Sequence, residues 1–342
     1  MTRQASQLRI LSSGRRADGP ALSVVIPVFN EAATLPLVRD SLERVLEPLC
    51  IAYEIILVDD GSADESWAGI SAWHKADNRV RGVRFARNFG KEAALSAGLL
   101  HARGAAVVLM DSDLQHPPEI IPAFLEKWRE GFEMVYAVRT SRDGDSALRR
   151  TATRAFYRLF KNIADVDLPP GAGDFRLIDR RVVDTLNRLP ERLRFMKGLY
   201  AWAGCRHTGV PFEPPPRRHG TSAMSMRRLT GFGLDGIVAF SRVPLAISGW
   251  VGAAVALASL VFGGYLALRT VIVGVDVPGY ASIMVGIMLL GGVQLLALGV
   301  LGAYVGRIYE ELKSRPLYVV AEELAAESEA AAKPTRETGP AA

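Results

Sequence analysis

Short apolar runs alternate with segments of helical periodicity along the first 130 residues of the chain. The runs have the length of buried strands and lie at 22–26, 53–58 and 105–109. The segments after them carry apolar residues at helical spacing and lie at about 34–46, 64–75 and 118–130. Strands that alternate with helices predict a parallel sheet with helices on its faces. The expected fold class is therefore α/β, with a Rossmann-like, mostly parallel sheet and flanking helices.

Two long uncharged stretches change this picture after residue 243. No residue is charged between Arg242 and Arg269, or between Asp276 and Arg307. Each stretch exceeds the roughly 20 residues that a membrane-spanning helix needs, and both are rich in Leu, Val, Ala and Gly. The sequence therefore predicts a two-helix transmembrane hairpin, and a buried hairpin in a soluble core is the alternative. The two helices are expected at about 244–268 and 281–305.

Basic residues flank the predicted hairpin at both of its outer ends. Five arginines lie within 217–242, before the first span, and Arg307, Lys313 and Arg315 follow the second. The connection between the spans is nearly uncharged. By the positive-inside rule, the large N-terminal domain and both chain termini are expected in the cytoplasm. The expected location is the plasma (cell inner) membrane, with a multi-pass topology.

Composition predicts the remaining boundaries. The polar, basic residues 1–20 lack the apolar core of a signal peptide and are expected to be a disordered leader. The other expected parts are a globular domain at 21–215 with an interfacial helix at about 146–163, a juxtamembrane amphipathic segment at 216–242, the spans within 243–307 and a cytoplasmic tail at 308–342. Two isolated cysteines, Cys50 and Cys205, are too few for a disulfide framework or a zinc site, which fits a reducing compartment.

The net charge of +5 is compatible with nucleic-acid binding, but the placement of the basic residues favours a membrane. Arginines and lysines interleave with apolar residues at 146–163 and again at 224–240. This pattern is typical of basic amphipathic helices that lie in a membrane interface. We therefore expect membrane lipids as partners and no nucleic acid. An ordinary solvated helix face is the alternative interpretation.

Oxygen-rich side chains follow all three of the predicted strands. Glu31 comes shortly after the first strand, Asp59 and Asp60 end the second, and Asp111 and Asp113 follow the third. In open parallel sheets, ligands bind at the carboxyl ends of the strands. Two carboxylates one residue apart can hold one divalent cation that also binds substrate phosphates, although turns and helix caps use aspartate too. The convergence predicts a site for a metal-bound diphosphate.

Several motifs then resemble a known family. They are PVFNE at 27–31, VDDGS at 58–62, RNFGK at 87–91, DSDLQHPPE at 111–119, GDFRLIDR at 173–180, RFMKG at 194–198, GAYVGRIYEE at 302–311 and RPLY at 315–318. The early motifs resemble family 2 glycosyltransferases. The later ones, with two C-terminal spans, resemble the polyprenyl-phosphate branch, which comprises the dolichol-phosphate mannose synthase group and bacterial undecaprenyl-phosphate glucosyltransferases. The resemblance implies a GT-A type of Rossmann-like sheet.

The resemblance also implies an activity. The expected reaction is the inverting, metal-dependent transfer of a sugar from a nucleotide-sugar, with UDP-glucose as the preferred donor, to undecaprenyl phosphate at the cytoplasmic membrane face. The product would be a lipid-linked sugar donor for cell-envelope glycosylation. The alternatives are the same reaction with GDP-mannose, UDP-N-acetylglucosamine or a modified arabinose, a processive transferase, a nucleotidyltransferase, and a non-catalytic membrane scaffold with a transferase-like domain.

Residue roles follow from the matched motifs. The expected catalytic residues are Asp113 and Asp174, and the expected ligands of Mg²⁺ or Mn²⁺ are Asp111, Asp113 and Gln115. The expected nucleotide-sugar contacts are Pro27, Phe29, Glu31, Asp59, Asp60, Lys91, Asp111 and Arg217. The expected lipid-phosphate ligands are Arg139 and Arg149.

Some of these assignments have alternatives. Glu31 is also explained as a favourable charge at a helix N-terminus, and Asp174 as a structural partner of Arg176. His116 is expected to pack at the strand–helix turn. Many members of the group carry a lysine where Ala223 stands, so only Arg217 is carried over from that motif. A homo-oligomer, with a tetramer as the expectation, is implied by the resemblance.

Overall fold

The computed structural model describes residues 19–139, 172–191, 194, 196–213, 243–273 and 279–325. These residues belong to two compact units, which are described separately. The first unit holds the described residues up to 213 and those from 316 onward, and the second holds 243–315. Residues 1–18 of the expected leader, the interfacial helix and the juxtamembrane segment, together with Arg149 and Arg217, lie outside the described residues.

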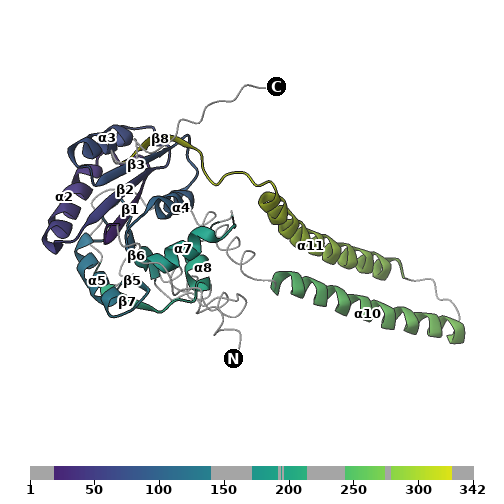
Figure 1. Ribbon diagram of the computed structural model, residues 1–342. Helices are drawn as coiled ribbons and strands as arrows, with labels where there is room; N and C mark the ends of the chain where they lie inside the picture. The colour runs from purple at the N-terminus through teal and green to yellow at the C-terminus, as the bar shows by residue number, and fades with distance from the viewer. Residues whose placement is uncertain are drawn as a thin grey trace, which may run out of the picture. The chain divides into compact units, whose positions relative to one another are not determined.

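A mixed sheet forms the centre of the first unit (Figure 1). Its strands are β1 (Leu22–Val28), β2 (Tyr53–Asp59), β3 (Val80–Phe85), β4 (Ala106–Leu109), β5 (Met134–Arg139), β6 (Ala172–Asp179), β7 (His207–Phe212) and β8 (Val320–Leu324). Their order across the sheet is β7-β5-β6-β4-β1-β2-β3-β8. The pairs β1–β2, β1–β4, β2–β3 and β5–β7 are parallel, and β3–β8, β4–β6 and β5–β6 are antiparallel. The expected α/β fold with a mostly parallel sheet is confirmed.

Helices cover both faces of this sheet (Figure 1). They are α2 (Leu35–Leu46), α3 (Ser66–Ala76), α4 (Lys91–His101), α5 (Ile121–Arg129), α7 (Arg180–Arg188) and α8 (Met196–Trp202), with short 3-10 turns η2 (Glu47–Leu49) and η3 (Pro118–Ile120). Helices α2, α3 and α5 pack on one face, and α4 and α7 pack on the other. Because both faces are covered, every residue of β2 is buried, which explains why its sequence is apolar apart from Glu54 and Asp59.

Helix α4 lies unusually close to the central strand β1. A Cβ atom added at Gly98 would lie 2.1 Å from Cγ1 of Val25, so no larger residue fits between this helix and the strand without movement. Gly90, with a φ of 96°, precedes the helix and occupies a backbone region that favours glycine. Gly98 thus lets α4 pack closely on β1, while Gly90 precedes the first residue of the helix, Lys91, whose side chain contacts Asp111 after β4.

The second unit contains two long helices, α10 (Val243–Val273) and α11 (Tyr280–Leu312), which contact each other. Within the described residues, Leu289–Leu312 is the one segment long and apolar enough, by length and composition, to cross a membrane. A shorter apolar helical segment runs over Leu245–Val255. Two helices therefore stand where the hairpin is expected, and the passage of both through a membrane stays a prediction.

Strand β8 stands inside the expected C-terminal tail. Val320–Leu324 pairs antiparallel with β3, so the residues that follow the apolar helices return to the sheet as an edge strand. The ring of Tyr318 stacks on Phe85, with the centroids 4.7 Å apart. The sequence does not predict this strand, because its acidic residues, Glu322 and Glu323, are unfavourable in a strand unless a partner is present.

Candidate active site

The carboxyl ends of β1, β2 and β4 lie next to one another in the sheet. Strand β1 pairs in parallel with both neighbours, in a register that places Val28 opposite Asp59 and Val25 opposite Leu109. The oxygen-rich residues after these strands therefore gather at one edge, as the alternation of strands and helices predicts. Asp174 joins them from β6, which pairs antiparallel with β4.

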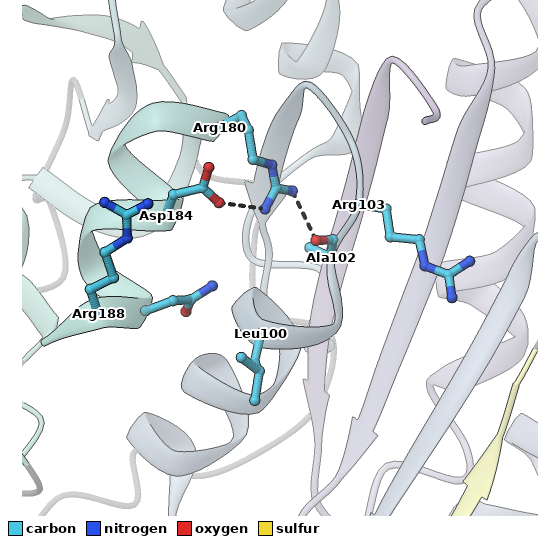
Figure 2. Close-up of a pocket in the computed structure, with 7 residues that line it drawn as sticks. Leu100, Ala102, Arg103, Arg180, Asp184 and Arg188 are labelled. Carbon is cyan, nitrogen blue, oxygen red and sulfur yellow. Dashed lines mark hydrogen bonds and ion pairs between the residues drawn. The ribbon is translucent and has the colours of Figure 1, made fainter. Parts of the chain in front are cut away.

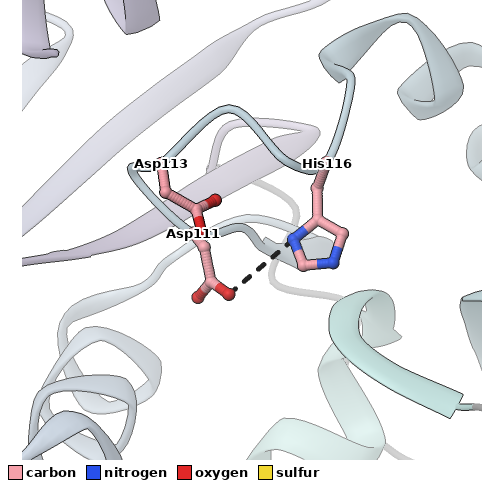
Figure 3. A group of neighbouring side chains, drawn as sticks. All are labelled: Asp111, Asp113 and His116. Atoms are coloured by element: carbon pink, nitrogen blue, oxygen red, sulfur yellow. Dashed lines mark ion pairs between the residues drawn. The ribbon is translucent and has the colours of Figure 1, made fainter. Parts of the chain in front are cut away.

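The loop after β4 brings two carboxylates and an imidazole together (Figure 3). Ligand atoms of Asp111, Asp113 and His116 all lie within 4.8 Å of one another. Leu114 adopts a left-handed conformation, with a φ of 55°, and this turns the loop back on itself. The amide of Gln115 donates to Oδ1 of Asp113 at 3.0 Å, which holds the exposed Asp113 carboxylate against the turn.

His116 is buried in the turn between β4 and η3, as expected from the sequence, and also faces the carboxylates. Its ring lies 5.3 Å from that of Phe175 and 5.9 Å from that of Phe212, between centroids. Its Nδ1 atom is 3.7 Å from Oδ2 of Asp111 and makes no hydrogen bond in the described part of the chain. Burial lowers the pKa of His116 although Asp111 and Asp113 act to raise it, so the imidazole is neutral at pH 7. The spacing Asp-x-Asp-x-x-His is the signal that sequence reasoning left unused.

This set of donors fits a divalent cation. Hard cations such as Mg²⁺ and Mn²⁺ prefer carboxylate oxygens, and Mn²⁺ also accepts a neutral imidazole. The orphaned Nδ1 of His116 is a ring nitrogen that lacks a protein hydrogen-bond partner among the described residues and faces Asp111. Gln115, the third expected ligand, has its Oε1 atom 3.4 Å from Nη2 of Arg139, which donates to it. Thus Gln115 and Arg139, expected to bind different groups, lie together.

Lys91 connects this loop to Asp174. Its Nζ atom is 2.7 Å from Oδ1 of Asp111 and 2.8 Å from Oδ2 of Asp174, and Nζ of Lys197 is 3.7 Å from the other oxygen of Asp174. In the described residues, the ion pairs of Asp174 are with these two lysines. Arg176, the alternative partner considered from sequence, instead stacks on the ring of Tyr200 at 3.9 Å.

The ion pairs between Lys91, Asp111 and Asp174 shift the pKa values of Lys91 and Asp174 so that both groups stay charged. Desolvation acts to lower the pKa of Lys91, but Asp174 and Asp111 outweigh it and raise that pKa above its usual range. Desolvation acts to raise the pKa of Asp174, but Lys91 and Lys197 hold it well below its usual range. Asp174 is therefore ionised at every physiological pH, which makes it a weak base and a good electrostatic partner.

Asp60 organises the loop that leads into α4. Its carboxylate accepts hydrogen bonds from the amides of Phe89 at 2.7 Å and Gly90 at 2.9 Å. Burial raises the pKa of Asp60 although these two amides lower it. Gly61, with a φ of 70°, allows the two loops to touch, since an added Cβ would lie 2.4 Å from the carbonyl carbon of Arg87.

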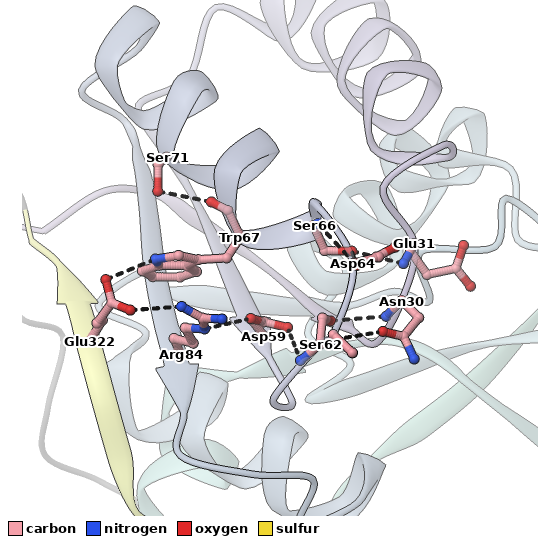
Figure 4. A network of polar contacts seen from close by, with 11 residues as sticks. Asn30, Glu31, Asp59, Ser62, Asp64, Ser66, Trp67, Ser71, Arg84 and Glu322 are labelled. Carbon is pink, nitrogen blue, oxygen red and sulfur yellow. Dashed lines mark hydrogen bonds and ion pairs between the residues drawn. The ribbon is translucent and has the colours of Figure 1, made fainter.

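Asp59 is completely buried at the end of β2 (Figure 4). Its Oδ1 atom accepts from the amide of Ser62 at 3.0 Å, and its Oδ2 atom lies 3.4 Å from Nε of Arg84. Both aspartates expected at the nucleotide end thus already hold backbone of the surrounding loops. Their direct contact with a nucleotide stays a prediction.

The residues after β1 have mixed surroundings. The side chain of Phe29 is 45% exposed, and Pro27 is partly buried within the strand. The carboxylate of Glu31 accepts a short hydrogen bond from the hydroxyl of Thr34, the residue that precedes α2. Glu31 therefore lies beside the helix N-terminus, where the alternative interpretation placed it, and it also stands at the edge that carries the other carboxylates.

A separate polar cavity of about 310 Å³ lies at the other end of α4 (Figure 2). It is lined by Leu100, Ala102, Arg103, Arg180, Asp184, Asn187 and Arg188. The guanidinium of Arg180 donates to the carbonyls of Ala102 at 2.9 Å and Gly104 at 2.8 Å, and approaches Asp184 at 3.5 Å. Arg180 thus satisfies the carbonyl of Ala102 at the end of α4 and the carbonyl of Gly104 in the loop that follows.

Comparison with known proteins identifies the family. Residues 23–186 match the family described as glycosyl transferase family 2. The chain is 48% identical, over 88% of its own length and 95% of the relative's, to an uncharacterised glycosyltransferase of Synechocystis. The chain belongs to glycosyl transferase family 2. This glycosyltransferase is also 41% identical, over 87% of its length and 97% of the relative's, to a prophage-derived bactoprenol glucosyl transferase of Shigella flexneri.

A solved structure is also similar to this glycosyltransferase. It is glucosyl-3-phosphoglycerate synthase from Mycobacterium tuberculosis in complex with Mn²⁺, UDP and glucosyl-3-phosphoglycerate. The two share 22% identity over 64% of this chain and 78% of the other, with a TM-score of 0.42. The resemblance drawn from the motifs and the assignment as an enzyme that transfers a sugar are confirmed by the family match and the relatives.

Proposed function

We propose that this glycosyltransferase moves glucose from UDP-glucose to the phosphate of a polyprenyl phosphate, namely undecaprenyl phosphate. The observation that carries the proposal is the bridge by Lys91 between Asp111 and Asp174. It joins a cluster suited to a metal-bound diphosphate to a carboxylate suited to the sugar. The acceptor and the sugar are supported by the Shigella relative, which is named a bactoprenol glucosyl transferase.

The donor end uses the loop after β4. Asp111 and Asp113, with Gln115 or His116, would hold Mg²⁺ or Mn²⁺. A divalent cation bound there neutralises the charge that develops on the departing diphosphate. Asp59, Asp60 and the segment from Pro27 to Glu31, including Phe29, form the nucleoside end through the loops that they shape. Arg217, outside the described residues, is proposed as a further contact to the nucleotide-sugar.

Lys91 supplies fixed positive charge between the leaving group and the sugar. Its raised pKa keeps the ammonium charged, and its position at the first turn of α4 adds the partial positive charge of a helix N-terminus. Preorganised charge of this kind stabilises negative charge that appears in the transition state. When a diphosphate enters, Lys91 can pair with it while it keeps its contact with Asp174.

The acceptor needs little help from a base. A phosphate monoester has its second pKa near 6 and is therefore mostly dianionic at neutral pH. One of its oxygens attacks the anomeric carbon as the bond from that carbon to the UDP oxygen breaks, so the configuration inverts and no proton has to be removed first. An α-linked donor would give a β-linked lipid phosphate sugar. The low pKa of Asp174 fits a role in orienting the acceptor and stabilising positive charge on the sugar ring.

The lipid phosphate is proposed to bind arginines at the side of the site. Arg139 ends β5, is exposed, and contacts the side chain of Gln115 in the loop after β4. Charge-assisted hydrogen bonds make arginine well suited to a phosphate. Arg149, outside the described residues, is proposed as its partner.

The membrane arrangement is part of the proposal. The apolar segment Leu289–Leu312 supports insertion into a membrane. We propose the topology expected from the sequence, with two spans in the plasma membrane, the catalytic domain of residues 21–215 and both termini in the cytoplasm, amphipathic segments in contact with membrane lipids, and assembly as a homotetramer.

A donor panel tests this function. The purified full-length protein is incubated with undecaprenyl phosphate, Mn²⁺ or Mg²⁺, and each labelled nucleotide-sugar in turn, before organic extraction. Label is expected in the lipid phase with UDP-glucose, and its transfer should be lost in Asp113→Ala but kept in the surface variant Glu130→Gln. Transfer from GDP-mannose or UDP-N-acetylglucosamine alone would reassign the sugar. No metal-dependent binding of any nucleotide would contradict the proposed function.

A further inference from the structure

Strand β8 carries a side chain that holds two residues of the neighbouring elements at once (Figure 4). Oε1 of Glu322 accepts from Nη1 of Arg84 at 2.8 Å, and its Oε2 accepts from the indole nitrogen of Trp67 at 3.0 Å. Arg84 and Glu322 are 238 residues apart in the chain. Both oxygens of the Glu322 carboxylate are thus used, one by the guanidinium of Arg84 and the other by the indole of Trp67.

Arg84 also contacts Asp59, at the end of β2 where the nucleotide is proposed to bind. Its Nε atom faces Oδ2 of Asp59 at 3.4 Å, an oxygen with no hydrogen bond among the described residues. Asp59 has no exposed surface, and a buried carboxylate is stable in its ionised form only beside a compensating charge. The orientation of Arg84 therefore bears on the orientation of Asp59.

Asp59 in turn holds the strand-end loops. Its other oxygen accepts from the amide of Ser62, whose hydroxyl accepts from the amide of Asn30 at 2.9 Å. Oδ1 of Asn30 accepts from the amide of Ala63 at 2.9 Å, and Asn30 has a left-handed φ of 55°. A continuous set of contacts therefore runs from Glu322 to the loops that follow β1 and β2.

The same C-terminal segment also contacts the loop that leads to Lys91. The carbonyl of Val319 accepts from the amide of Ala86 at 2.9 Å, next to the stacked rings of Tyr318 and Phe85. Phe85 packs edge-on against Phe89, with the centroids 5.8 Å apart, and the amide of Phe89 donates to Asp60. Residues 318–324 therefore contact the start of the loop after β3 directly, through Ala86, and they reach the loops after β1 and β2 through Arg84 and Asp59.

We propose that residues 318–324 are a positioning element for nucleotide binding, in which Glu322 acts through Arg84 on Asp59. This inference rests on the proposed function, because it takes the edge with Asp59 and Asp60 as the nucleotide end. Arg84 and Glu322 touch no reacting atom and are positioning residues. Affinity for the nucleotide thus depends on a segment that the chain forms only after its apolar helices.

A purely structural pair would behave differently. An exposed ion pair contributes little to folding, and the loss of a pair without any contact to the nucleotide end would leave substrate binding unchanged. Glu322 and Glu130 have similar side-chain exposure, 53% and 50%, and each pairs with one cation at 2.8 to 2.9 Å. Glu130 belongs to the end of α5 and contacts Lys127, so Glu130→Gln is a matched control for Glu322→Gln.

The test uses the full-length protein with UDP and Mn²⁺ in a calorimetric titration, and steady-state kinetics with both substrates. Glu322→Gln and Arg84→Lys are expected to raise the dissociation constant of UDP and the KM for the donor about three- to tenfold. The KM for undecaprenyl phosphate should stay unchanged, and Glu130→Gln should match the wild type. In an Asp59→Asn background, Glu322→Gln should change the affinity for UDP much less, because Glu322 is proposed to act on the nucleotide through Asp59.

The outcomes separate the two proposals. Wild-type affinity for UDP in Glu322→Gln and Arg84→Lys, or equal effects on donor and acceptor KM, would overturn this inference and leave the proposed function standing. Failure of the wild type itself to bind UDP would overturn both. If Arg84→Lys does not fold, the inference is tested with Glu322→Gln and Trp67→Phe. The first variant weakens the contacts of the Glu322 carboxylate, and the second removes the hydrogen bond from Trp67 to Glu322.

Discussion

Lys91 and Asp174 form an ion pair of 2.8 Å between Nζ and Oδ2, although they lie 83 residues apart in α4 and β6. The pair exists because α4 packs closely on β1 while β6 runs antiparallel beside β4. It places the ammonium of Lys91 between the carboxylates of Asp111 and Asp174 at the edge of the sheet.

Replacement of Lys91 by methionine should lower kcat about 10²- to 10³-fold, which is typical for the loss of one preorganised stabilising group. Asp111 and Asp174 would then lack their shared cation. Steady-state transfer of labelled glucose to lipid phosphate measures the effect. Lys127→Met, which removes an exposed lysine from a surface ion pair, is the control and should keep full activity. Full activity of Lys91→Met would contradict the role given to this residue.

Removal of divalent cations should abolish transfer. The enzyme is treated with EDTA, then with Mn²⁺ or Mg²⁺, and activity is followed through both steps. Return of activity is expected in the wild type and not in Asp113→Ala, because that variant lacks one of the two carboxylate ligands. Transfer that persists in EDTA would contradict the assignment of a metal to Asp111 and Asp113.

Glu92 should make stability depend on pH. Burial, and then the nearby Asp174, raise the pKa of Glu92 from 4.5 to about 7, and its Oε2 atom makes no hydrogen bond among the described residues. The folded protein binds this proton more tightly than the unfolded chain does. The resulting contribution to stability is fully present below pH 4.5 and is lost as the pH rises through about 7. The free energy of unfolding should fall by about 1 to 3 kcal/mol over this range.

Chemical unfolding of wild type and Glu92→Gln between pH 5 and 8 measures this contribution. The wild type should lose stability over this range, and the variant should lose less, since a neutral amide does not titrate. Glu65→Gln offers a control on an exposed residue that precedes α3. Equal pH profiles in wild type and Glu92→Gln would show that Glu92 does not titrate in this window.

Gly98→Ala should destabilise the first unit by about 1 to 3 kcal/mol, because the new methyl group would overlap Cγ1 of Val25 and force α4 away from β1. Lys91 moves with this helix, so transfer should fall as well. Gly69→Ala in α3 is a matched control, since its Cβ would lie at an ordinary 3.4 Å from Leu35. It should be neutral or slightly stabilising, as alanine favours helices more than glycine does. Thermal unfolding of both variants distinguishes the two cases.

Much of the fold follows from local pattern. The alternation of apolar runs with helical periodicity predicts β1, β2 and β4 and the helices after them, since burial on both faces makes a strand mostly apolar. Helix α4, the strands β3, β5, β6 and β7 and the edge strand β8 are not predicted by that alternation. Helix α4, for example, buries every residue from Ala93 to Leu99 and therefore lacks a clear apolar face.

The candidate site divides in the same way. The sequence by itself determined which chemical groups are present and that three sets of them follow strands, because the carboxyl ends of parallel strands share one edge. It also determined the family, through motifs that stand close together in the chain. Only the tertiary structure decided that Lys91 joins Asp111 to Asp174, that His116 faces the carboxylates, and that Glu322 reaches Arg84. These contacts join residues from different elements, and their geometry depends on helix packing and strand order, which local hydrophobic pattern does not encode.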